Sequence, residues 1–182
     1  MKELTQRFLV IHAAALLCFL LSAAPACAEE ASEYQLKAAF IYNFVQFTEW
    51  PASAFSAPDE PIMLAIVGPD PFNGGLERAV KDKIVGGRSL AVRHFASADS
   101  VERCHLIFVP AAETGGQAIL KRLAGKSILT VGDGEDFTRA GGVIRFYREK
   151  NRIRFEVNVK AVDRSKLKIS AKLLKLATIY EE

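Results

Sequence analysis

The first 28 residues constrain what the rest of this 182-residue chain can become. Two basic residues, Lys2 and Arg7, precede an apolar run over residues 8–21, and the tripeptide ACA at residues 26–28 closes the segment in an A-x-A pattern. This order of features is typical of a secretory signal peptide. The apolar run is also shorter than the about 20 apolar residues that a membrane-spanning helix needs. We therefore expect cleavage before Glu29 and a protein that works outside the cytoplasm.

Export also limits how the fold can be stabilised. Removing 28 of the 182 residues leaves 154, which is enough for one domain with a sizeable core, and we expect that domain over residues 29–182. Of the three cysteines, Cys18 and Cys27 lie in the predicted signal peptide and only Cys104 lies in the domain. Because no internal disulfide is then available, the apolar core alone must hold the fold. The 24 basic and 21 acidic residues nearly balance, which argues against a nucleic-acid partner.

Two cysteines carry alternatives that the sequence leaves open. A cysteine after small residues is also the pattern of a lipid acceptor in bacterial lipoproteins, so lipid attachment at Cys27 is the alternative to cleavage after Ala28. Ala24 stands where such acceptors usually have a large aliphatic residue, which favours cleavage. Cys104 directly precedes an apolar run and is interpreted as a buried, unreactive thiol. A redox sensor or an intermolecular disulfide is the alternative for Cys104.

A helix with an aromatic face is predicted over residues 33–47. Its apolar positions recur at spacings of four, four and three residues, as expected for one face of an amphipathic helix: Leu36, Phe40, Phe44 and Phe47. Ser32 is the expected N-cap of this helix. Trp50-Pro51 is its expected end, because the residue before a proline avoids helical angles.

The middle of the chain alternates between predicted strands and helices. A continuous apolar run, typical of a strand covered on both faces, occurs at residues 62–67, and further strands are predicted over residues 90–95, 105–109 and 127–131. Helices are predicted between these strands over residues 75–83 and 116–123. This alternation predicts a parallel sheet with helical crossovers.

The C-terminal part has a different pattern. Residues 143–148 and 152–160 are extended runs with apolar residues at alternate positions in the second, which predicts an antiparallel hairpin. A last helix is predicted over residues 170–180. The whole pattern predicts the α/β class: a mostly parallel sheet of about four strands, extended by a C-terminal antiparallel hairpin, with helices on both faces.

Residues suited to catalysis or metal binding are few. The three histidines, His12, His94 and His105, form no H-x-x-x-H pattern, and no Cys/His cluster or G-x-S-x-G motif is present. The acidic segment over residues 132–136 lacks the spacing of a calcium loop and is interpreted as a solvated turn. We therefore predict a protein that is not an enzyme and needs neither a cofactor nor a metal ion.

One segment is a candidate for lining a ligand pocket. Gly68, Asp70 and Phe72 directly follow the predicted strand over residues 62–67. Open α/β sheets bind ligands at the carboxyl ends of their strands, which is where this segment lies. Pro69 and Pro71 lack the backbone donors of a phosphate site, so the segment is interpreted as a rigid turn, and a small-molecule pocket is the alternative.

Three ordered motifs resemble one protein family. The first is YQLKAAFIYNF at residues 34–44, followed by TEWP at residues 48–51. The second is GGVIRF at residues 141–146 with IRFEVN at residues 153–158, and the third is LKISAKLLKLA at residues 167–177. They are similar to the opening segment, the closing hairpin and the last helix of the YfiR-like family, which is also described as a domain of unknown function.

The resemblance implies a periplasmic regulatory protein. The member that names the family restrains an inner-membrane diguanylate cyclase by binding its periplasmic part, and an outer-membrane lipoprotein relieves the inhibition, which changes cyclic di-GMP levels and biofilm formation. Other members occur with sensor kinases or transport systems, so the resemblance leaves the partner open. Members of the naming type carry several cysteines whose disulfides couple them to redox state. Only Cys104 remains in the expected domain here, so that redox control is not carried over.

The resulting expectation is a periplasmic binding protein that controls an inner-membrane diguanylate cyclase or histidine kinase by protein–protein contact. We expect the contacts to centre on Phe146, Glu156 and Ile169 in the closing hairpin and last helix. An outer-membrane lipoprotein and a second copy of this chain, joined through an apolar helix, are the further expected partners. A small-ligand sensor or carrier, with its pocket at residues 68–72, is the alternative.

Overall fold

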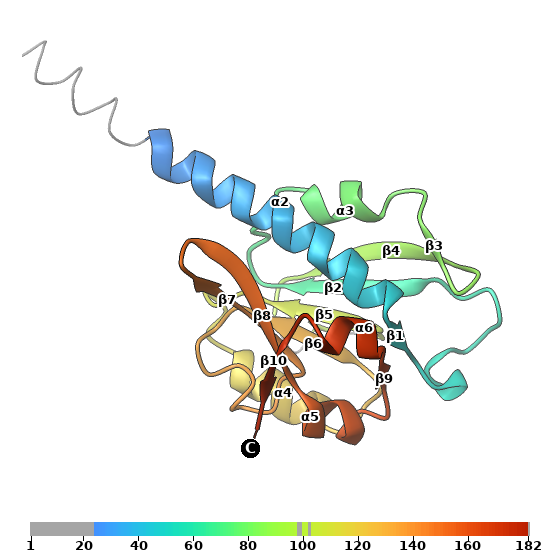
Figure 1. Ribbon diagram of the computed structural model, residues 1–182. Helices are drawn as coiled ribbons and strands as arrows, with labels where there is room; N and C mark the ends of the chain where they lie inside the picture. The colour runs from blue at the N-terminus through green and yellow to red at the C-terminus, as the bar shows by residue number, and fades with distance from the viewer. Residues whose placement is uncertain (1–23, 98–99, 102, 182) are drawn as a thin grey trace, which may run out of the picture.

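The computed structural model describes residues 24–97, 100–101 and 103–181. Most of the predicted signal peptide therefore lies outside the described residues. Its last five residues belong to helix α2 (Ala24–Gln46), whose first turns project beyond the sheet (Figure 1). The N-cap prediction for Ser32 is wrong, because the alanines and glutamates before it are good helix formers and α2 runs through this position.

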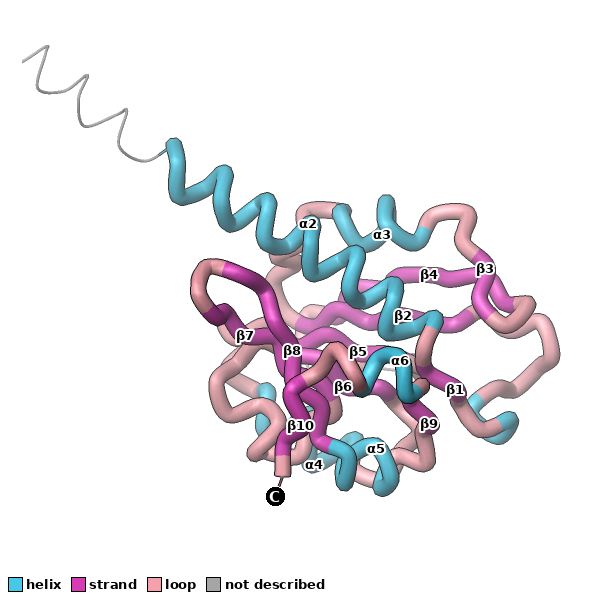
Figure 2. Tube along the Cα trace, in the orientation of Figure 1, coloured by secondary structure: helices cyan, strands magenta, loops and turns pink. Residues whose placement is uncertain are grey.

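A sheet of eight strands forms the centre of the described region (Figure 2). In spatial order these strands are β10 (Thr178–Tyr180), β8 (Arg152–Asn158), β7 (Ile144–Glu149), β6 (Leu129–Gly132), β5 (Leu106–Val109), β2 (Ile62–Val67), β4 (Arg88–Phe95) and β3 (Ile84–Val85). The five from β7 to β4 run parallel, while β7–β8 and β3–β4 are antiparallel pairs. The predicted class, the parallel sheet and the hairpin are confirmed, but the expected four parallel strands are too few. Separately, β1 (Thr48–Glu49) pairs with β9 (Lys168–Ile169).

The C-terminal segment departs from the prediction of one long helix. Only α6 (Ala171–Leu174) is helical, and β10 follows it, pairing in parallel with β8. Thr178, Ile179 and Tyr180 are β-branched or aromatic, and β8 offers them a free edge, so pairing overrides the helical spacing. The predicted strand over residues 152–160 is also shorter. Asn158 caps helix α5 (Val159–Arg164) by accepting a hydrogen bond from the Ala161 amide at 2.9 Å.

Helices cover both faces of the sheet, as predicted. On one face α2 and α3 (Gly75–Val80) pack over the larger part of the core, and on the other α4 (Gly116–Leu123) packs over a smaller cluster. Strand β2 serves both faces, because Leu64 and Ile66 point to the first core and Ala65 and Val67 to the second. This double burial explains the continuous apolar run in the sequence.

The order of the strands defines one edge of the sheet as the place to look for a site. From β2 the chain moves to β4 on one side and then returns to β5 on the other side. Ligands in open α/β sheets bind outside the carboxyl ends of the strands at such a reversal. The segments at this edge follow β2, β5 and β6.

None of the helices in the described residues has both the length and the apolar character needed to cross a membrane.

Candidate functional site

Gly68 connects two turns at the carboxyl edge of the sheet. It has a left-handed backbone with φ of +75°, and its amide donates a hydrogen bond to the Phe95 carbonyl at 2.9 Å. A Cβ atom here would lie 2.4 Å from Oε2 of Glu113, which comes from the turn after β5. Oε1 of Glu113 accepts a hydrogen bond from the Gly115 amide at 3.0 Å. Gly68 therefore lets the turns after β2 and β5 approach each other.

The other two predicted pocket residues hold the same turn together. Both carboxylate oxygens of Asp70 accept backbone hydrogen bonds, Oδ1 from Phe72 at 2.8 Å and Oδ2 from Gly74 at 3.1 Å. Phe72 is 3% exposed, and its ring packs edge-on against Tyr34 and Phe108, with centroids 5.4 and 4.8 Å apart. In this conformation Phe72 belongs to the core under α2, so it offers a small molecule no open surface.

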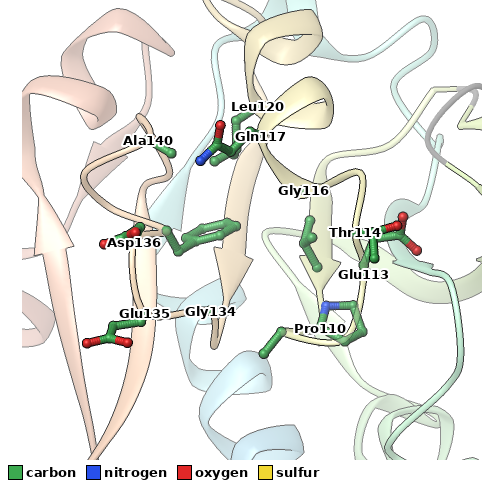
Figure 3. Close-up of a pocket in the computed structure, with 13 residues that line it drawn as sticks. Pro110, Glu113, Thr114, Gly116, Gln117, Leu120, Gly134, Glu135, Asp136 and Ala140 are labelled. Atoms are coloured by element: carbon green, nitrogen blue, oxygen red, sulfur yellow. The ribbon is translucent and has the colours of Figure 1, made fainter.

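A cavity of about 260 Å³ lies between the β5–α4 turn and the loop after β6 (Figure 3). Apolar side chains form its walls: Val109, Leu120, Phe137 and Ala140. The Gln117 amide lines the cavity from α4, while the carboxylates of Glu135 and Asp136 point away from that helix. The volume is below the roughly 300–1,000 Å³ of typical small-molecule sites. This cavity therefore suits only a small, mainly apolar group.

A buried ion pair fastens α2 to this edge. Lys37 is 4% exposed, and its Nζ lies 2.7 Å from Oδ2 of Asp133 and 2.8 Å from Oε1 of Glu33. Asp133 also accepts hydrogen bonds from the Tyr34 hydroxyl at 2.9 Å and the Ala111 amide at 2.6 Å. The interpretation of residues 132–136 as a solvated turn is therefore wrong for Asp133, because that carboxylate neutralises a cation that α2 buries.

This ion pair is not among the predictions from the sequence, although the sequence contains one clue to it. Lys37 precedes Ile41 by four residues and Phe44 by seven, so it lies on the buried face of the helix. A lysine on an apolar face needs an anionic partner, since an unpaired buried charge is very costly. The partner Asp133 is 96 residues away, and no local pattern identifies it.

The residues predicted to contact a partner do not form one patch. Phe146 is 1% exposed and stacks on Phe44 of α2 with ring centroids 5.4 Å apart. In the β7–β8 pairing, Arg145 faces Glu156, so Glu156 and Phe146 lie on opposite faces of the sheet. Ile169 is half-buried in β9. Partner contact through these residues stays a prediction, and in this conformation Phe146 presents no side-chain surface to a partner.

Glu156 is the acceptor of a cross-strand network. Its Oε1 accepts hydrogen bonds from the Thr138 hydroxyl and from Nε of Arg145, the latter at 2.8 Å. Burial alone would raise the pKa of the Glu156 carboxyl, but the bonds from Arg145 and Thr138 outweigh it and hold this pKa below its usual range. The same bond raises the pKa of Arg145. Glu156 is thus ionised and bound within the protein.

The outer face of α2 is an uncharged surface. Between Tyr34 and Phe47 the only charged residue is Lys37, which is buried. The exposed positions of this stretch define the outer face: Gln35, Leu36, Ala39, Asn43 and Gln46. Leu36 is 47% exposed. Because charged residues are depleted at the centres of protein interfaces, an uncharged helix face in a chain with 25% charged residues suits a protein partner.

Cys104 is a free cysteine and is buried, as predicted. Burial raises the pKa of its thiol to about 12, against the opposing influence of Lys126 and Arg122. The reactive form of a cysteine is the thiolate, which is scarce at neutral pH when the pKa is this high. The interpretation as an unreactive thiol agrees with this environment.

Comparison with known families agrees with the three motifs found in the sequence. No curated protein matches the chain. The family model described as YfiR/HmsC-like matches residues 34–178, from α2 to the first residue of β10. The match covers 145 of the 182 residues and includes Lys37 and Asp133. The chain therefore belongs to the YfiR/HmsC-like family.

Proposed function

We propose that this protein is a periplasmic regulator that controls an inner-membrane signalling protein, a diguanylate cyclase or a sensor kinase, through protein–protein contact. The family match over residues 34–178 carries this proposal, because the family is a regulatory one and not a known family of enzymes. Export through the signal peptide at residues 1–28 is part of the proposal. By binding one of two states of its receptor more tightly, the protein would shift the receptor toward that state.

The outer face of α2 is the contact surface that the structure supports best. This face is uncharged, and the pair between Lys37 and Asp133 holds the helix that carries it in a fixed position. Phe146 supports α2 from beneath by stacking on Phe44. We therefore propose that Phe146 acts on partner binding by positioning α2, while the partner touches Leu36 and its exposed neighbours.

The experiment compares two exposed aliphatic residues that lie far apart in the fold. Leu36 is on α2, and Ile84, which is 70% exposed, is on edge strand β3. We expect Leu36→Asp to abolish co-purification of a membrane sensor and to reproduce the effect of deleting the gene on cyclic di-GMP or kinase output. Ile84→Asp should retain both functions. The proposal fails if gene deletion changes neither output and the wild-type protein captures no membrane sensor.

The cavity beside α4 supports a second candidate function, small-ligand sensing. Its rim includes Ala111, whose amide donates a hydrogen bond to Asp133. A ligand there would therefore touch a residue bonded to the carboxylate that pairs with Lys37 of α2. Thermal-shift measurements against a panel of small periplasmic metabolites test this function. A specific shift that is lost in Ala140→Trp, which fills the cavity, would support it. A flat response from the wild-type protein would reject it.

A further inference from the structure

Three potential metal ligands from separate elements meet at the carboxyl edge beside β4. Asp70 lies in the turn after β2, Glu77 lies on α3, and His94 is the penultimate residue of β4. One ligand atom from each side chain lies within 4.8 Å of the other two. The register explains the meeting, because His94 is paired with Ile66, whose side chain points to the face that α3 covers.

One oxygen of the cluster has no partner in the described residues. Oε1 of Glu77 is in direct contact with Nε2 of His94. Oε2 of Glu77 accepts no hydrogen bond and is inaccessible to solvent, although the side chain as a whole is 40% exposed. A buried carboxylate oxygen without a donor is costly, and a bound cation removes that cost.

The remaining contacts hold the ligands in place. The Phe72 and Gly74 amides each bond one oxygen of Asp70, which fixes the carboxylate and leaves lone pairs on both oxygens. Such bonds to the far side of a ligand orient it toward a metal ion. The His94 side chain is 43% exposed, so the cluster is open to an ion arriving from solvent.

We propose that Asp70, Glu77 and His94 form a binding site for a divalent transition-metal ion. An imidazole nitrogen with two carboxylates suits zinc, manganese or cobalt, whereas magnesium and calcium prefer sites made of oxygen alone. Three protein ligands leave a coordination position open for water or for a group from a partner. The ion would join the turn after β2, α3 and β4. No sequence spacing marks this site, because each ligand comes from a different element.

The test is a calorimetric titration of the purified, untagged protein with zinc chloride after removal of bound metal. We expect one saturable site, little heat from magnesium chloride, and a higher unfolding temperature with zinc. Glu77→Gln and His94→Gln should each weaken zinc binding by more than about tenfold, since changes even beyond the direct ligands cost about 10–100-fold. Glu135→Gln, a matched change of an exposed carboxylate on the cavity rim, should bind zinc as tightly as the wild-type protein.

Two further measurements separate loss of the site from loss of the fold. Without metal, both variants should unfold at the wild-type temperature, because Glu77 and His94 are partly exposed. Cobalt bound to the wild-type protein should give visible absorption bands that His94→Gln removes. The absence of saturable zinc binding by the wild-type protein, or wild-type affinity in His94→Gln, would overturn the proposal.

Discussion

Two of the ion pairs that join elements of this sheet differ in reach and in burial. Lys37–Asp133 joins α2 to the end of β6 across 96 residues, and its side chains are 5% and 7% exposed. Arg145–Glu156 joins neighbouring strands of one hairpin, and its side chains are 19% and 12% exposed. The first pair helps to position a whole helix. The second joins residues only 11 positions apart in the sequence, on two strands that already pair through their backbones.

The two ion pairs differ in how much free energy the loss of one partner costs. Losing one partner of a buried pair leaves the other charge without compensation, and the cost rises with burial. Lys37 has two carboxylate partners, and its Nζ also lies over the Tyr34 ring. Loss of Lys37 therefore leaves more buried charge without a partner than loss of Glu156 does. Of these two pairs, the deeper one therefore matters more for the position of α2, and with it for the proposed contact face.

Replacement of Lys37 is expected to have the largest effect. Lys37→Met keeps most of the side-chain volume but leaves Asp133 as a buried, unpaired carboxylate, so we expect a loss of about 3–5 kcal/mol in the free energy of unfolding. Urea denaturation followed by circular dichroism measures this loss. Co-purification of the membrane sensor should fall in parallel if α2 carries the contact face.

A double variant shows whether the stability loss in Lys37→Met comes from the unpaired Asp133 carboxylate or from lost packing. In Lys37→Met/Asp133→Asn the amide oxygen still accepts from Tyr34 and Ala111, while the unpaired charge is gone. We expect the double variant to be more stable than Lys37→Met alone, with a favourable coupling energy between the two positions. If the stability losses of Lys37→Met and Asp133→Asn, measured separately, simply add in the double variant, the ion pair does not hold α2 in place.

Replacement of Glu156 is expected to cost less and to depend on pH. Glu156→Gln weakens the bond to Arg145, for an expected loss of about 1.5–3 kcal/mol at pH 7. The pKa of Glu156 is lowered in the folded protein, so the stability from its charge is present above the usual carboxyl range and is lost as the pH falls through the folded pKa. Urea denaturation from pH 7 to pH 3 should show that the difference in free energy of unfolding between variant and wild type becomes smaller in acid. A constant difference would mean that the charge contributes nothing.

Much of the fold could be predicted because local patterns specify it. The predicted bounds of β2 and α4 agree with the structure to the residue, since continuous apolar runs and helical spacing appear directly in the sequence. β10 could not be predicted this way, because its state depends on the free edge of β8. Here tertiary pairing overrides a helical pattern.

The candidate site was harder to predict than the fold. The position of Asp70 after a predicted strand marks it in the sequence, yet Glu77 and His94 join it only through the register of β4 and the crossover through α3. A sequence motif contains Phe146, but the pleat of the strand directs its side chain into the core. Side-chain partners far apart in sequence are fixed by topology, and a single sequence does not display topology.

Cys104 is a buried group outside both ion pairs, and its replacement should have the smallest effect on the free energy of unfolding. Burial keeps its thiol protonated, with a pKa of about 12, because desolvation outweighs the opposing influence of Lys126 and Arg122. A thiol-specific reagent at pH 8 should therefore modify Cys104 only after urea unfolds the protein, and Cys104→Ala should lower the free energy of unfolding by about 1 kcal/mol. Rapid modification of the native protein would show that this end of β5 opens readily, and would restore the redox-sensor hypothesis for Cys104.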